Sequence, residues 1–379
     1  MKSQLLLEIF LFFLVVIIIP LGMLFLCQPM YDYYVNESND GGLVQEDYYV
    51  GGLRCDKICR SRELQPHKSI DLSIVIPAYN EVQRLPLMIE PTMDFLKEYA
   101  SRYRLNYEII VVDDYSSDDT SKLVLTYAEG EELKRRAQEQ SSGREKDDDN
   151  EEGGDEGKDC TGEEGTCTKA KTSIRNTPAD IRLVQLKSNK GKGGAIKRGV
   201  LFARGHYILF ADADGATDIK SLEKLMNSLK EIEKVDHHMG KVGMSIGSRA
   251  HLEKDSISQR KWYRTILMHG FHLLVSLLCT DQIKDTQCGF KLFTKSAAKI
   301  LFSNLHLEGW AFDTEIIYLA ESLNIPISEV AVHWQEVEGS KLIQTKLDVV
   351  KTSLYMARDM LCLRMAYLFR IWDIHVKKV

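Results

Sequence analysis

Two aspartates one residue apart follow a short apolar run in the middle of the chain. Residues 207–214 read Tyr-Ile-Leu-Phe-Ala-Asp-Ala-Asp, which predicts a buried strand that ends in Asp212 and Asp214. Side chains at i and i+2 of a strand point to the same face, so the two carboxylates are expected to converge while Ala213 turns away. Paired carboxylates suit Mg²⁺ or Mn²⁺, which would bind the phosphates of a substrate. The alternative is an ordinary solvated turn.

Further polar residues lie at other predicted strand ends. Pro77 follows one apolar β-branched run, and Asp113 and Asp114 follow the next. Strands alternate with helices, which predicts an α/β fold with a mostly parallel sheet and helices on both faces. Ligands bind beyond the carboxyl ends of such strands, where these residues would meet. The predicted strands are 72–76, 107–112, 181–186, 207–214 and 243–246, and the predicted helices are 85–103, 120–132, 195–204 and 219–234.

A glycine- and lysine-rich loop is predicted at 187–194, between a strand and a helix. Residues 188–194 read Ser-Asn-Lys-Gly-Lys-Gly-Gly, and glycines allow the backbone to approach a ligand closely. The side chain of Lys192 suits a phosphate. The loop lacks the spacing of a nucleoside-triphosphatase loop. It is either a phosphate-binding segment or a flexible basic turn.

The charge of the chain is unevenly distributed. Its 379 residues carry a net charge of −6, whereas residues 129–164 contain 15 acidic and 6 basic residues, a net −9. The remainder is mildly basic at +3, far from the strong positive field of a nucleic-acid-binding protein. Residues 129–177 have almost no large apolar side chains and are predicted to form a disordered acidic insertion. The alternative is an interaction tail for a basic partner.

An uncharged apolar segment lies near the N-terminus. Residues 9–27 would span roughly 28 Å as a helix, close to the hydrocarbon thickness of a bilayer. We predict an uncleaved transmembrane anchor, after a short segment 1–8 and before a tether at 28–70; a cleaved signal peptide is the alternative. Lys2 weakly favours a cytosolic N-terminus, whereas the sequon at Asn36 would be glycosylated only in the lumen.

The eight cysteines are scattered, with no pair of CxxC motifs. A zinc site is therefore not expected. The pattern is typical of a reduced, cytosol-facing protein rather than of a disulfide framework.

Four runs near the predicted strand ends resemble the inverting family 2 glycosyltransferases, which have the GT-A fold. They span 73–81, 110–114, 189–193 and 210–217. Later runs are similar to members of this family that act on polyprenyl phosphates. These span 246–249, 285–293, 310–315 and 338–342. The resemblance implies one GT-A (Rossmann-like) domain at 71–345, interrupted by the acidic insertion.

The resemblance implies a role for each matching residue. Asp212 and Asp214 would hold Mg²⁺ or Mn²⁺ on the donor diphosphate, which makes Asp214 a catalytic residue. Asp313 would orient hydroxyl groups of the acceptor or of glucose, unless it is a helix cap. The residues implied in donor binding are Pro77, Tyr79, Asn80, Glu81, Asp113, Asp114, Lys192 and Asp212. Those implied in binding the acceptor phosphate are Arg249, Arg264 and Lys341.

The resemblance further implies transfer of glucose from UDP-glucose to dolichyl phosphate, for protein N-glycosylation. Direct attack would invert the α linkage of the donor to β, and an anionic phosphate needs little help from a general base. Ala216 stands where mannosyl-transferring relatives have a glutamine, which favours glucose and leaves the third protein ligand of the metal unassigned. The alternatives are a mannosyltransferase using GDP-mannose and a membrane-tethered interaction protein on a decayed transferase scaffold.

Two later segments mix aromatic, aliphatic and basic residues. Residues 262–279 and 352–372 would contact membrane lipid or, alternatively, pack in the core. We therefore predict a C-terminal membrane-associated helix within 346–379. Because nucleotide sugars are cytosolic, the resemblance implies a single-pass protein of the endoplasmic reticulum membrane with its catalytic domain facing the cytosol.

Overall fold

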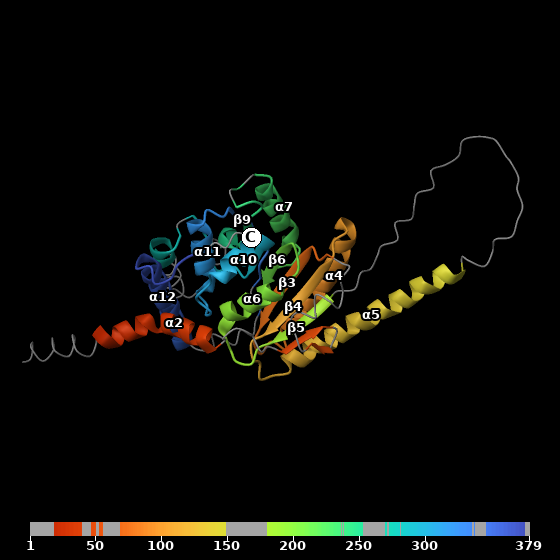
Figure 1. Cartoon of the computed structure of the whole chain (residues 1–379), viewed down its shortest axis with the longest axis horizontal. Coiled ribbons are helices and arrows are strands. Elements are labelled where there is room, and N and C mark those ends of the chain that lie inside the picture. The colour runs from red at the N-terminus through yellow and green to blue at the C-terminus, as the bar shows by residue number, and fades with distance from the viewer. Residues whose placement is uncertain are drawn as a thin grey trace, which may run out of the picture.

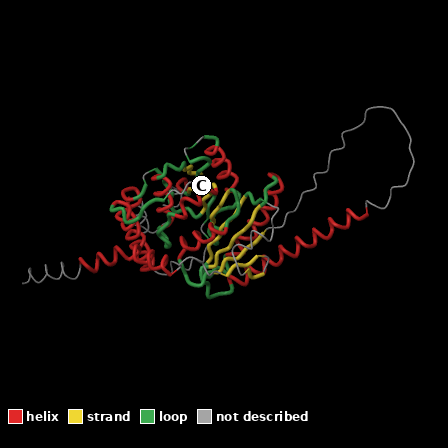
Figure 2. The backbone as a smooth tube through the Cα atoms, viewed as in Figure 1, coloured by secondary structure: helices red, strands yellow, loops and turns green. Residues whose placement is uncertain are grey.

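One mixed sheet forms the centre of the described part of the chain. The computed structural model describes residues 19–39, 47–50, 53–55, 69–148, 180–235, 237, 239–252, 270, 273–280, 282–335, 337 and 346–375. Nine strands are arranged in the order β2-β1-β5-β4-β3-β6-β8-β7-β9, with helices on both faces (Figure 1, Figure 2). The strands are β1 Asp47–Val50, β2 Leu53–Cys55, β3 Leu72–Ala78, β4 Tyr107–Asp113, β5 Asp180–Gln185, β6 Tyr207–Ala211, β7 Met244–Ser248, β8 Phe290–Thr294 and β9 Ile327–Ala331. The helices are α2 Ile19–Asn39, α4 Leu85–Tyr103, α5 Thr120–Asp148, α6 Gly191–Phe202, α7 Ser221–Glu233, η2 Ala250–Leu252, α10 Lys295–Ser303, α11 Phe312–Ser322 and α12 Lys346–Leu368.

The predicted α/β class is confirmed, but the sheet is mixed rather than mostly parallel. Strands β5, β4, β3 and β6 pair in parallel, as the alternation of strands and helices predicts. Strand β8 pairs antiparallel to both β6 and β7, and β1 pairs antiparallel to β5. The direction of a strand is not encoded in its own residues, because the antiparallel β8 is as fully buried as the parallel strand β4.

Apolar side chains fill both faces of the sheet. One cluster lies against α4, α5 and α7 and includes Ile74 and Leu222. The other lies against α6, α10 and α11 and includes Val75, Phe210 and Ile316. Neighbouring side chains of β3 thus point to opposite faces of the sheet, as expected for a strand buried on both sides.

Helix α5 is longer than the sequence predicts. It continues to Asp148, so residues 129–148 of the predicted disordered insertion are helical, and its far end extends away from the sheet (Figure 1). Good helix formers and ion pairs one turn apart explain this extension. Glu132, for example, pairs with both Arg135 and Arg136. Residues 149–177 of the insertion lie outside the described residues.

The predicted tether also contains regular structure. Strands β1 and β2 form an antiparallel pair within 28–70, and β1 pairs with β5, where Tyr48 lies opposite Val184. The free edge of β5 offers unpaired backbone groups that a short extended segment can bind. The predicted tether at 28–70 did not include this pairing, because it joins residues far apart in the sequence.

The N-terminal helix α2 packs against α12. The rings of Phe25 and Tyr355 lie 6.0 Å apart, and the Arg358 guanidinium lies 5.1 Å from the Phe25 ring. Within the described ranges, no helix has the length and apolar content needed to cross a membrane. Residues 9–18 of the predicted anchor lie outside those ranges, and its remainder belongs to α2.

A buried carboxylate ties together the amino-terminal ends of the central strands. Glu108 of β4 is fully buried and accepts hydrogen bonds from the Ser73 hydroxyl (2.6 Å) and from Arg182 Nη1 (2.7 Å). Arg204 donates to it through both its backbone N–H (2.8 Å) and Nε (2.8 Å). The network joins β3, β4, β5 and the segment before β6, at the edge opposite the strand ends discussed above.

We expect Glu108→Ala to lower the free energy of unfolding by about 3–5 kcal/mol, because it leaves the buried Arg182 guanidinium without its carboxylate partner. Chemical denaturation would measure the loss. The control is Arg102→Ala, which removes an exposed pair with Glu98 and should change stability by less than about 1 kcal/mol. Equal stabilities of the two variants would contradict this account of the network.

Candidate active site

The carboxyl ends of β3, β4 and β6 form one edge of the sheet. Strand β3 lies between β4 and β6, and its register pairs Ala78 with Asp113. Pro77 is the second-to-last residue of β3, Asp113 is the last residue of β4, and Asp212 directly follows β6. The structure therefore places these predicted site residues along a single edge.

Asn80 connects the end of β3 to the loop after β4. Its backbone has a positive φ of 56°, and its side-chain oxygen accepts hydrogen bonds from the backbone N–H of Ser117 (2.8 Å) and Asp118 (3.2 Å). Its own N–H donates to the Ser116 hydroxyl (2.9 Å). Tyr115 in the same loop also has a positive φ of 65°, a conformation that a non-glycine residue rarely adopts. Asn80 thus shapes the loop beside the predicted donor site.

Other predicted donor-binding residues are engaged within the protein or face solvent. The Asp113 carboxylate accepts hydrogen bonds from the Ser121 hydroxyl and from the backbone N–H of Ser116 (3.0 Å). Glu81 forms an ion pair with Arg84. The Tyr79 side chain is exposed. The contacts of Asp113 and Glu81 fix the loops at this edge of the sheet. The exposed Tyr79 ring is accessible to a ligand.

Asp114 links β4 to the start of α6. It is buried, and its carboxylate accepts a short hydrogen bond from the backbone N–H of Lys190 (2.6 Å). Burial raises the pKa of Asp114 to about 6, although the backbone N–H groups of Lys190 and Gly191 oppose the shift. Asp114 therefore positions the segment that carries Lys192.

The glycines of the basic segment serve close packing inside the protein. Helix α6 begins at Gly191, so the predicted loop at 187–194 is shorter than expected. A Cβ at Gly191 would lie 2.7 Å from the Glu308 carbonyl oxygen, and one at Gly193 would lie 2.6 Å from the Cβ of Phe312. Glycines occur both in phosphate-binding loops and where the backbone packs too closely for a side chain. At Gly191 and Gly193 the structure shows close backbone packing.

Lys192 is the basic group nearest to the paired aspartates. Its ammonium lies 2.8 Å from Asp212 Oδ1 and within 6 Å of the rings of Phe210, Trp310 and Phe312. Burial alone would lower the pKa of Lys192, but the carboxylates of Asp212 and Asp313 raise it above its usual value. The ammonium is therefore held in its charged form at the sheet edge.

A second buried pair lies behind the first. Lys291 of β8 is fully buried, and its ammonium donates to Asp313 Oδ1 (2.5 Å) and to the Cys288 carbonyl oxygen (2.7 Å). Asp313 lies in the first turn of α11, whose N-cap is Ala311, so the helix-cap alternative for Asp313 is wrong. Sequence reasoning assigned no role to Lys291; its signals were a lysine in an otherwise apolar strand and its place in the 285–293 run.

Asp212 and Asp214 lie in a turn rather than on the strand. Strand β6 ends at Ala211, so the alternation argument for their convergence does not apply. Asp214 Oδ1 accepts a hydrogen bond from the backbone N–H of Ala216 (3.0 Å), and the Asp212 N–H donates to the Gly289 carbonyl oxygen (3.1 Å). The turn is thus fixed by its own backbone and by the segment before β8.

Asp212 and Asp214 offer oxygen ligands of the kind that a divalent ion prefers. Both side chains are partly exposed, and their oxygens are the hard ligands that Mg²⁺ and Mn²⁺ prefer. Within the described residues, no group of three His, Cys, Asp or Glu side chains could hold a metal. Mg²⁺ is commonly bound through one or two carboxylates together with substrate phosphates, and this is the mode that the sequence predicts for Asp212 and Asp214.

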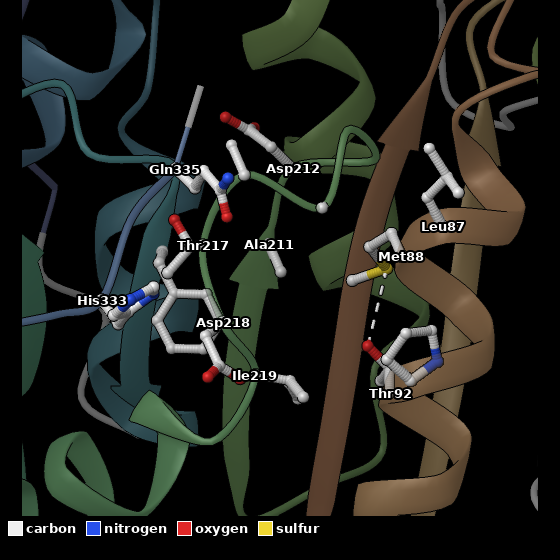
Figure 3. A pocket seen from close by; sticks show the side chains of 14 residues that line it. Leu87, Met88, Thr92, Ala211, Asp212, Thr217, Asp218, Ile219, His333 and Gln335 are labelled. Carbon is white, nitrogen blue, oxygen red and sulfur yellow. Dashed lines mark hydrogen bonds between the residues drawn. The ribbon is translucent and has the colours of Figure 1, made fainter. Parts of the chain in front are cut away.

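A pocket of about 240 Å³ adjoins Asp212 on the side facing α4. Figure 3 shows Met88 and Thr92 of α4 on one side and Thr217, His333 and Gln335 on the other. None of its lining residues is a lysine or an arginine. The pocket therefore suits a neutral group better than a phosphate.

Arg249 lies beyond β7 and is held by Asp285. Its Nε and Nη2 donate to the two oxygens of Asp285 (2.8 and 2.9 Å), and its guanidinium lies 5.5 Å from the Trp334 ring. Burial opposes ionisation of Asp285, but Arg249 prevails and lowers the pKa of this carboxyl group. The other two residues predicted to bind the acceptor phosphate, Arg264 and Lys341, lie outside the described residues.

We expect Gly289→Ala to reduce catalytic activity at this site by at least about a hundredfold while the protein stays folded. A Cβ at this position would lie 1.9 Å from Asp212 Oδ2, so the carboxylate must move. Initial rates and circular dichroism would test this expectation. Gly130→Ala is the control, since a Cβ there meets nothing within 4 Å. Wild-type rates for Gly289→Ala would show that the position of Asp212 is unimportant.

The titration of Asp114 predicts a pH dependence of stability. Its pKa is raised above the unfolded value, so ionisation of the buried carboxyl destabilises the fold. That cost is absent at low pH and complete above about pH 6. Relative to Asp114→Asn, the wild type should therefore lose about 2–3 kcal/mol between pH 4 and pH 7. Denaturation of both proteins across this range measures the difference, and a constant difference would contradict the expectation.

The chain is similar in sequence to known proteins. The family model for glycosyl transferase family 2 matches residues 73–145 and 164–302. A dolichyl-phosphate beta-glucosyltransferase of Dictyostelium discoideum is 42% identical over 82% of this chain and 78% of its own length. The enzyme of that name from Saccharomyces cerevisiae is 37% identical over 82% and 79%. Among solved structures, mannosyl-3-phosphoglycerate synthase from Rubrobacter xylanophilus has a TM-score of 0.47 at 15% identity, covering 85% of this chain and 81% of that one. The chain therefore belongs to glycosyl transferase family 2 and is a glycosyltransferase.

Proposed function

We propose that this enzyme transfers glucose from UDP-glucose to dolichyl phosphate and inverts the anomeric configuration. The main support is the name shared by relatives 37–42% identical over about four fifths of the chain. The geometry supports it as well, because carboxylates and a charged lysine meet at the sheet edge where α/β folds bind ligands.

The charges at this edge suit the departure of a nucleoside diphosphate. The Lys192 ammonium beside Asp212 would offset the negative charge that grows on the leaving diphosphate. A divalent ion, held by Asp212 and Asp214 when bound, would add further positive charge at the same place. Asp212 would then share its oxygens between Lys192 and the ion.

The acceptor requires little proton transfer. A phosphate monoester is already anionic at neutral pH, so it can attack without a strong general base. Asp313 is paired with Lys291, which suits a role in orienting hydroxyl groups rather than in removing a proton. Asp285 fixes the Arg249 guanidinium through Nε and Nη2. The guanidinium would bind the acceptor phosphate through its other N–H groups. Attack from the side opposite the diphosphate would give the β product.

A lipid acceptor requires access to a membrane. Helix α12 and the residues after it expose large apolar side chains, and α2 does so beside it. We propose that this surface lies on the endoplasmic reticulum membrane, with residues 9–27 as a single-pass anchor and the catalytic domain in the cytosol. The exposed apolar residues of the C-terminal region are Val350, Leu354, Tyr355, Leu361, Met365, Leu368, Phe369 and Ile371.

Incubation of membranes containing the full-length protein with dolichyl phosphate and labelled nucleotide sugars tests the reaction. We expect label in the lipid fraction from UDP-glucose and none above background from GDP-mannose. Asp214→Ala should reduce transfer at least about a hundredfold. Asp94→Ala, on the exposed surface of α4, should leave it unchanged. Lipid labelled only by GDP-mannose would replace this proposal with a mannosyltransferase.

A further inference from the structure

The loop between α10 and α11, residues 304–311, lies between the candidate active site and the two terminal helices. On its active-site side, the Glu308 carbonyl oxygen accepts a hydrogen bond from the Gly194 N–H (3.0 Å). The Trp310 ring lies 5.6 Å from the Lys192 ammonium. The start of α6 is packed so closely here that Gly191 has no room for a side chain. The position of this loop therefore determines the surroundings of Lys192.

Glu315 holds the beginning of this loop. It lies on α11 two residues after Asp313 and is fully buried. Its carboxylate accepts hydrogen bonds from the backbone N–H groups of His306 (3.1 Å) and Leu307 (2.6 Å), and His306 Nδ1 lies 2.9 Å from Oε1. A buried carboxylate depends on such donors, so the loop cannot move away without leaving Glu315 poorly paired.

The other side of Glu315 faces the terminal helices. The Tyr367 hydroxyl of α12 lies 3.2 Å from Oε1 of Glu315, as a hydrogen-bond donor. The Trp372 ring stacks on the His306 ring, with centroids 4.2 Å apart and an interplanar angle of 8°. Tyr33 of α2 lies 4.6 Å from the same imidazole. The Glu315 carboxylate therefore joins α11, the 304–311 loop and α12. It also contacts His306, which lies against Tyr33 of α2.

We propose that Glu315 is a positioning residue that couples the docking of α12 to the geometry of the Lys192–Asp212 pair. With Tyr367 docked, Glu315 holds the loop against the start of α6, and Trp310 covers the Lys192 ammonium. Without that hydroxyl, Glu315 loses a donor and the loop is held less tightly. The proposal relies on the proposed function only for the reaction that is affected, since the contacts themselves do not depend on the substrate.

Hydrogen exchange of the full-length protein tests this coupling without an activity assay. Tyr367→Phe keeps the ring and removes only the hydroxyl. The matched control is Tyr318→Phe on α11, whose ring lies 5.0 Å from that of Tyr367. In Tyr367→Phe we expect exchange in 304–311 and 189–195 to rise about tenfold, with β3 and β4 unchanged. Unchanged exchange in both segments, or an equal rise throughout the sheet, would overturn the proposal.

Kinetics separate positioning from a merely structural role. We expect kcat of Tyr367→Phe to fall about five- to tenfold, with the KM for UDP-glucose within about twofold of wild type. Tyr318→Phe should match the wild type in both. A wild-type kcat for Tyr367→Phe, per folded molecule, would refute the coupling. If the wild-type protein transfers no glucose, the proposed function fails, and the exchange measurement still decides the role of Glu315.

Discussion

Two lysine–aspartate pairs at the carboxyl edge of the sheet depend on one another. Lys192 pairs with Asp212 near the surface, and Lys291 pairs with Asp313 in the interior behind it. A charge that is buried without a partner is strongly unfavourable, so Lys291 and Asp313 require each other, and Lys192 interacts electrostatically with both Asp212 and Asp313. They come from α6, the turn after β6, β8 and α11, and this requirement constrains how those elements pack.

Close backbone contacts provide the precision that such a cluster needs. Gly289 lies against the Asp212 carboxylate, and Gly191 and Gly193 lie against the segment that leads into α11. Each contact leaves no room for a Cβ, so the positions of Asp212 and of the start of α6 are set by backbone rather than by a flexible neighbour. This arrangement agrees with a transferase in which charges must be in place before the diphosphate departs.

The terminal regions are part of the same arrangement. Helices α2 and α12 pack on each other and reach the active-site side of the molecule through the 304–311 loop. Their exposed apolar side chains suit a lipid surface. The helices that would meet the acceptor's membrane are thus connected, through Glu315, to the lysine that would meet the donor's diphosphate.

The sequence by itself determined the central strands and the residues at their ends. Apolar runs bounded by Pro77, Asp113 and Asp212 predict buried parallel strands, and local periodicity suffices to find them. Sequence patterns could not determine the antiparallel direction of β8, the pairing of β1 with β5, or the partner of Asp313, because each depends on residues distant in the chain. Local pattern also failed where β6 stops at Ala211, since the chain turns there and Asp214 bonds back to the N–H of Ala216. Tertiary structure decided these features because buried charges and backbone groups must be paired, and only the fold determines which partners lie near them.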